Sequence, residues 1–124
     1  MFDERSISIL AYNLETIMAE KLETILSRNE ANTRLRDFYD TYILQKLRGF
    51  EYDPAILKQA LEQTATKRGS MDVLSRYKIA MNEIKNSSRI LDFWQRYQRD
   101  FSYADDISYE DICRTIEEIL DKVM

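Results

Sequence analysis

The chain has 124 residues, of which 44% are hydrophobic and 32% are charged, with only 2 glycines and 1 proline. This composition fits one folded domain, alone or as part of a larger protein, and excludes disordered, collagen-like and low-complexity chains. The formal net charge of -4 argues against a free-standing nucleic-acid-binding protein, which usually has a basic face.

The cysteine and histidine content narrows the chemistry further. Cys113 is the only cysteine, so no internal disulfide can form and the chain suits a reducing cytoplasm. No histidine is present, which removes the commonest general base near neutral pH and the His-based zinc sites. The start of the chain lacks the apolar region of a signal peptide, and no apolar run approaches the roughly 18 residues of a membrane span. We therefore expect a cytoplasmic protein with no membrane partner and no metal site or cofactor in this chain.

The first predicted helix interrupts its apolar face with a charge. Before it, residues 6–9 alternate, which indicates either a short strand or an extended lead-in anchored by two isoleucines. Asn13 is a good N-cap for a helix that runs to about Arg28, with apolar residues at 3.6-residue spacing. Lys21 falls near the middle of that apolar stripe, and Arg28 continues the same line.

A second helix is predicted over residues 33–48, ending at Gly49. Its apolar residues cover a very wide arc, so we expect it to be central and the most buried helix. Arg36 and Asp40 lie one turn apart within that arc, and Asp37 sits at its edge. This helix therefore also carries charges that a solvated surface helix does not need.

The rest of the chain indicates further helices with ordinary apolar faces. They are expected to begin near Pro54, Asp72, Ser88 and Ser108. The predicted fold class is all-α, a compact bundle of five to six helices preceded by a short extended N-terminal segment. We expect residues 1–124 to form a single helical domain.

The charges in the first two helices have two interpretations. The turn between these helices is short, so they should be antiparallel neighbours with Lys21 level with Asp40. A structural ion pair that fixes the register of the two helices explains both residues. Alternatively, Lys21, Arg28 and Arg36 form a phosphate-facing cluster that Asp37 and Asp40 orient.

Two motifs in this region resemble the AbiEii/AbiGii toxin family of bacterial nucleotidyltransferases. The first is Ala19-Glu-Lys-Leu-Glu-Thr-Ile-Leu-Ser-Arg28, and the second is Arg34-Leu-Arg36-Asp37-Phe-Tyr-Asp40, followed by Leu44. They are similar to the family's alanine-glutamate-lysine-leucine helix and its arginine-x-basic-aspartate-x-x-aspartate helix. Trp94, Tyr97 and the last helix are similar to its weaker C-terminal pattern.

The resemblance implies a nucleotidyltransferase-type toxin of an abortive-infection or toxin–antitoxin system. It assigns catalytic roles to Lys21 and Asp40 in an intact protein, and nucleotide-binding roles to Lys21, Arg28, Arg36 and Asp37. It also implies Mg²⁺ and a nucleoside triphosphate for the intact protein, with a nucleotide, a cognate antitoxin and an RNA acceptor as partners.

The chain departs from the family pattern in one respect. The family's core carries a Gly-Ser element followed by an aspartate-x-aspartate metal site, whereas Gly69-Ser70 is the only Gly-Ser here and no Asp-x-Asp follows it. We therefore expect this chain to correspond to the C-terminal helical half, whose partner is a missing nucleotidyltransferase core. Apolar surface left by that core, at residues 6–10 and on the outer side of the first helix, should favour self-association.

Other interpretations remain. The chain could be a stand-alone helical protein-interaction module with a purely structural charged seam. Arg89, Arg96 and Arg99 could contact RNA, although such arginines more often solvate a helix. Asp105-Asp106 is more typical of a turn than of a metal site, and Cys113 is expected to be an inert core thiol.

Overall fold

The computed structural model describes residues 14–124. The alternating segment at 6–9 and the predicted N-cap at Asn13 lie outside these described residues. The described part of the chain is all-α, with seven α-helices and no strand, which confirms the predicted class. The helices are α2 (Leu14–Arg28), α3 (Arg36–Arg48), α4 (Pro54–Arg68), α5 (Met71–Ser75), α6 (Tyr77–Lys85), α7 (Ser88–Asp100) and α8 (Tyr109–Val123), with short 3-10 turns η1 (Asn29–Ala31) and η2 (Ser102–Ala104).

Several helix boundaries follow from residues that were recognisable in the sequence. The Asp53 side chain accepts a hydrogen bond from the Ala55 amide at 2.8 Å and so caps α4. Gly69 ends this helix in the left-handed conformation, with a φ of 73°, which a glycine adopts without steric cost. The hydroxyls of Ser87 and Ser108 cap α7 and α8 in the same way as Asp53 caps α4.

The helix expected from Asp72 to residue 85 is broken in two, which raises the number of helices from six to seven. Arg76 leaves helical geometry, with φ -113° and ψ 34°, between α5 and α6. The break redirects the chain. Both helices contact α2, but α5 packs also on α4, whereas α6 packs mainly on α8 and η1. The expected count of five to six helices was therefore too low.

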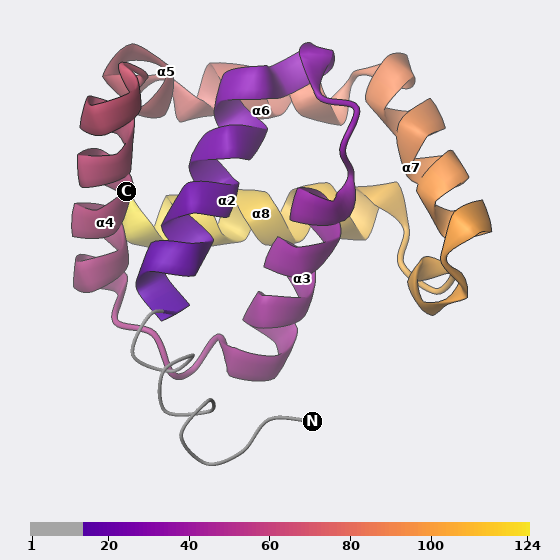
Figure 1. Cartoon of the computed structure of the whole chain (residues 1–124), viewed down its shortest axis with the longest axis horizontal. Helices are drawn as coiled ribbons and strands as arrows, with labels where there is room; N and C mark the ends of the chain where they lie inside the picture. Colours follow the sequence, from indigo (N-terminus) through magenta and orange to yellow (C-terminus); the bar gives the residue numbers. More distant parts are fainter. Residues whose placement is uncertain (1–13) are drawn as a thin grey trace.

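The central helix is α2, and the prediction that the helix at 33–48 would be central and the most buried is wrong. Figure 1 shows α2 between α4 and α3, with α8 crossing behind them. Seven side chains of α2 are buried, whereas α3 buries only Phe38 and Thr41. The wide apolar arc of α3 is left half-covered, since this helix packs mainly on α2 and α8 and Leu47 is 67% exposed.

Exposed apolar side chains gather away from α2. Among the described residues, the large ones are Leu47, Phe50, Ile56, Met71, Ile79, Phe101 and Tyr103. None belongs to α2, so the outer side of this helix does not offer the apolar surface expected for self-association, and residues 6–10 lie outside the described part. No helix within residues 14–124 is long and apolar enough to cross a membrane.

Candidate functional site

Two antiparallel helices bring four charged side chains together in the α2–α3 seam, defined as Lys21, Arg36, Asp37 and Asp40. Lys21 Nζ donates a hydrogen bond to Asp40 Oδ2 at 2.9 Å and lies 3.6 Å from Asp37 Oδ1. Arg36 Nε lies 3.7 Å from Asp40 Oδ2, one helical turn away on the same helix. The prediction that Lys21 and Asp40 lie level with each other is therefore confirmed.

The connection between α2 and α3 sets this register. Asn32 is fully buried, and its side-chain oxygen accepts a hydrogen bond from the Arg34 amide at 2.8 Å. Such an Asx contact fixes a turn locally. It holds the chain where α3 can begin at Arg36 and run back along α2, so that the acidic face of α3 meets Lys21 (Figure 1).

The seam is open to solvent. The side chains of Lys21, Asp37 and Asp40 are 23%, 25% and 30% exposed, whereas Arg36 is 78% exposed. A hollow of about 230 Å³ adjoins them, lined by Ile17, Glu20, Lys21, Thr24, Asp37 and Arg68. Water can therefore reach the ammonium group, and the carboxylates hold Lys21 in place without sealing it from a ligand.

Arg28 is not part of this seam. It ends α2, is exposed, and lies two helical turns, about 10 Å along the axis, from Lys21. It forms no ion pair with any other residue in 14–124. The structure thus brings together four of the five predicted site residues, whereas Arg28 lies farther along α2.

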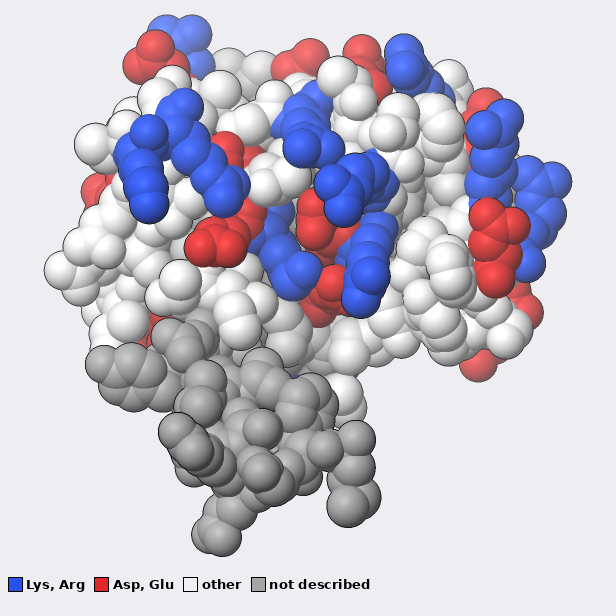
Figure 2. All heavy atoms as spheres, in the orientation of Figure 1, with Lys and Arg blue, Asp and Glu red and all other residues white. Residues whose placement is uncertain are grey.

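A second ion pair at the same hollow was missed in the sequence. Arg68 Nη1 donates to Glu23 Oε2 at 2.9 Å, and Ser27 donates to the other Glu23 oxygen at 2.7 Å. The Glu23 side chain is only 7% exposed. Glu23 lies in the apolar stripe of α2, between Ala19 and Leu26, and this position could have indicated a buried carboxylate. Its partner could not be predicted in the same way, because Arg68 belongs to α4. Figure 2 shows cationic and acidic residues interleaved over this face.

Two of the three α7 arginines that were considered for RNA contact, Arg89 and Arg96, lie over an aromatic ring. The guanidinium groups of Arg89 and Arg96 lie 5.8 Å and 5.5 Å from the centre of the Phe93 ring. Such cation–π contacts add modest stability at exposed positions. This arrangement accounts for both arginines as the solvated face of α7.

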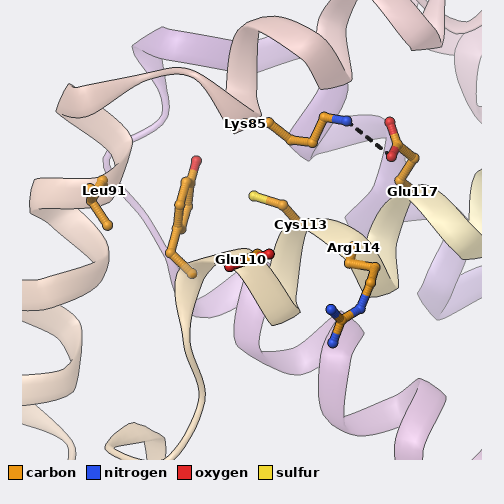
Figure 3. A pocket seen from close by; sticks show the side chains of 7 residues that line it. Lys85, Leu91, Glu110, Cys113, Arg114 and Glu117 are labelled. Atoms are coloured by element: carbon orange, nitrogen blue, oxygen red, sulfur yellow. Dashed lines mark hydrogen bonds and ion pairs between the residues drawn. The ribbon is translucent and has the colours of Figure 1, made fainter.

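A separate hollow of about 470 Å³ surrounds Cys113, lined by Lys85, Leu91, Tyr109, Glu110, Cys113, Arg114 and Glu117 (Figure 3). Lys85 Nζ donates to Glu117 Oε1 at 3.1 Å across its rim. Burial raises the pKa of the Cys113 thiol to about 11, despite the hydrogen bond with Tyr109 and the positive charge of Lys85, which both lower it. The thiol is therefore protonated at neutral pH, in keeping with the prediction of an inert core cysteine.

Cys113 should react with iodoacetamide on the order of 100-fold more slowly than a free cysteine at pH 8, because only the thiolate is nucleophilic. The rate should rise as the pH approaches about 11. The folded thiol keeps its proton above the ordinary pKa of 9.0, so the stability associated with this group is lost as pH rises from about 9 to about 11. Mass spectrometry of alkylation against pH, with Cys113→Ala as the blank, measures this. Alkylation at the free-cysteine rate at pH 8 would contradict it.

The described residues do not fit a magnesium ion. Within 14–124 no group of three or more acidic, cysteine or histidine side chains is placed to hold a metal. The space between the two carboxylates of the seam is taken by the ammonium group of Lys21.

The described helices form an all-α fold that holds Lys21 between the carboxylates of Asp37 and Asp40, with the exposed Arg36 beside them. The family model of the nucleotidyl transferase AbiEii toxin of type IV toxin–antitoxin (TA) systems matches residues 1–122. The chain belongs to this family, which confirms the resemblance carried by the two motifs. No curated protein and no solved structure matches the chain.

Family membership brings general properties. Nucleotidyltransferases act on nucleoside triphosphates with Mg²⁺, and toxins of this type are paired with antitoxins. These are properties of the family, and the contribution of this chain to them has to be argued from its own residues.

Proposed function

We propose that this chain is the helical portion of a nucleotidyltransferase-type toxin and contributes nucleotide-phosphate contacts to a catalytic core outside the chain. The observation that carries the proposal is the position of Lys21, which lies 2.9 Å from Asp40 and 3.6 Å from Asp37 beside an open hollow. Two carboxylates fix the ammonium group in one place and leave it reachable. A preorganised cation of this kind can stabilise the charge that develops on a transferring phosphoryl group.

Each seam residue has a role in this proposal. Lys21 touches a phosphate oxygen in the intact protein and is the catalytic candidate. Asp40 and Asp37 position it, and Asp40 also holds Arg36 at 3.7 Å. Arg36, which is 78% exposed, and Arg28 present planar guanidinium groups that suit phosphate oxygens.

The partners follow from the same roles. The catalytic core supplies the metal-binding carboxylates that this chain lacks in its sequence pattern, and Mg²⁺ acts there. The nucleoside triphosphate and an RNA acceptor meet at the junction of the two parts. A cognate antitoxin would silence the assembled toxin.

A second candidate function is a stand-alone interaction module in which the seam only fixes the register of α2 against α3. The short Lys21–Asp40 hydrogen bond favours this alternative, because it joins two packed helices. The two functions differ in whether the cations of the seam bind an anion.

Binding of inorganic triphosphate to the isolated full chain tests the proposal. We expect measurable binding by calorimetry that weakens as salt rises, because the contact is electrostatic. We also expect no transfer of a labelled nucleotide, since the metal-binding pair belongs to the core. Metal-dependent transfer by the pure chain would show that it holds its own catalytic site, and absence of triphosphate binding would favour the interaction module.

A further inference from the structure

Four aromatic side chains gather at the side of the seam, where α3 meets the end of α7 and η2. This aromatic cluster consists of Tyr39, Tyr97, Phe101 and Tyr103. The ring of Tyr103 packs edge-on against Tyr39, with centres 4.7 Å apart, and lies 5.4 Å from Phe101. The Tyr97 and Tyr103 hydroxyls are hydrogen-bonded at 2.8 Å. The cluster thus joins residues from α3 and from the far end of the chain.

The cluster adjoins the charged seam directly. Tyr39 precedes Asp40 in α3, so the two neighbouring residues belong to cluster and seam respectively. Burial, the Tyr103 hydroxyl and the Asp40 charge raise the pKa of Tyr97, and the Arg36 charge lowers it. The geometric link between cluster and seam is Tyr39, whose ring lies 6.1 Å from that of Tyr97 and 4.7 Å from that of Tyr103.

Two members of the cluster keep a large part of their surface exposed to solvent. Phe101 is 42% exposed and Tyr103 is 54% exposed. Figure 2 shows uncharged surface beside the central charged residues, on the side where Figure 1 places α7. Exposed aromatic faces next to cations are the usual composition of surfaces that bind single nucleotides or unpaired bases.

Groups outside the cluster also anchor η2 and the loop that follows it. Trp94 is 1% exposed, and its indole nitrogen donates to the Ile107 carbonyl at 3.0 Å. Gln98 Nε2 donates to the carbonyls of Ile107 at 2.8 Å and Ala104 at 3.2 Å. Because these buried and half-buried groups also hold the loop, the exposed faces of Phe101 and Tyr103 remain available to a ligand.

We propose that Phe101 and Tyr103 form a stacking surface for a nucleobase whose phosphate is held by Lys21 and Arg36. The inference rests on the proposed function and adds the recognition of the base to that of the phosphate. Stacking tolerates any base, because every base has a π face. The base can belong to the substrate nucleoside triphosphate or to an unpaired nucleotide of the acceptor RNA, which share the same chemistry.

The test compares three probes on the full chain by calorimetry: inorganic triphosphate, ATP and a short unpaired oligoadenylate. We expect ATP to bind on the order of 10-fold more tightly than inorganic triphosphate, as one stacked base provides. Tyr103→Leu and Phe101→Leu should each remove most of that difference and leave the affinity for triphosphate unchanged. Tyr103→Phe should retain it, because the ring remains.

Phe50→Leu is the matched control, since Phe50 is 84% exposed and lies at the turn between α3 and α4, outside the cluster. It should change neither affinity. If a variant fails to fold, the affinities of the unaltered chain for ATP and for inorganic triphosphate still test whether the base adds to binding. Tighter binding of ATP than of the oligonucleotide assigns the surface to the substrate base, and the reverse assigns it to the acceptor.

Equal affinity for ATP and inorganic triphosphate would overturn the stacking surface and leave the phosphate site intact. Failure of triphosphate itself to bind would overturn both, so the two failures are distinguishable. A loss of triphosphate affinity in Tyr103→Leu equal to its loss of ATP affinity would also overturn the stacking surface, because the ring would then act on the seam alone.

Discussion

Replacing Lys21 with alanine should reduce nucleotide transfer by the intact protein at least about 100-fold, the usual effect of removing a preorganised group that stabilises transition-state charge. The stability of this chain should fall by less than about 1 kcal/mol. The small effect is expected because Lys21 and Asp40 are 23% and 30% exposed, so water solvates the carboxylates left behind. Thermal melting of the chain and transfer by the intact protein measure the two effects separately.

Asp40→Asn tests the same site by changing the hydrogen-bond partner of Lys21. It removes the charge that positions Lys21 while keeping the shape of the side chain, so transfer should fall with little change in melting. Lys78→Ala is the matched control, because Lys78 is an exposed lysine of α6 that is not part of the seam. If Lys21→Ala melts far below the unaltered chain and activity only follows the folded fraction, the seam is a structural pair.

Replacing Arg68 with alanine should have the opposite profile, with a loss of about 2–3 kcal/mol of stability and a melting temperature lower by about 10 °C. Arg68 pairs with Glu23 at 2.9 Å, and the Glu23 side chain is only 7% exposed. Removing the guanidinium leaves a carboxylate buried between α2 and α4, with the Ser27 hydroxyl as its remaining partner. Thermal and urea unfolding of the full chain measure the loss.

A double variant separates the buried charge from the loss of packing. Glu23→Gln combined with Arg68→Ala should recover part of the stability, because no unpaired charge then remains buried. Lys67→Ala is the control, since Lys67 is the exposed neighbour in the last turn of α4 and tests the general loss of a cation there. An Arg68→Ala chain as stable as Lys67→Ala would show that Glu23 does not need its partner.

The contrast between these two ion pairs lies in burial. Both join α2 to a neighbouring helix at nearly the same distance, 2.9 Å. A half-exposed pair contributes little to stability, whereas a buried carboxylate that loses its partner is costly. We therefore expect stability measurements to identify Glu23–Arg68 as the structural pair and to show only a small contribution from Lys21–Asp40.

The spacing of apolar, charged and capping residues along the sequence was sufficient to predict the helical class and part of the seam. The all-α class, the capping of α4 by Asp53 and the meeting of Lys21 with Asp40 were predictable. Caps and helical periodicity act within a few residues, and a short turn between two helices leaves one antiparallel register. Both family motifs lie in the α2–α3 hairpin, each within one continuous segment, so they could be recognised from the sequence.

Only the tertiary structure decided which helix is central and which distant residues share the site. Arg68 is 45 positions from Glu23, and Tyr103 contacts Tyr39 across about half the length of the chain. The break of the helix at Arg76 likewise follows from the different neighbours of α5 and α6. Periodicity shows which face of a helix is apolar, but the partner of each face depends on how all the helices pack together. The buried ion pair and the aromatic cluster arise at that level.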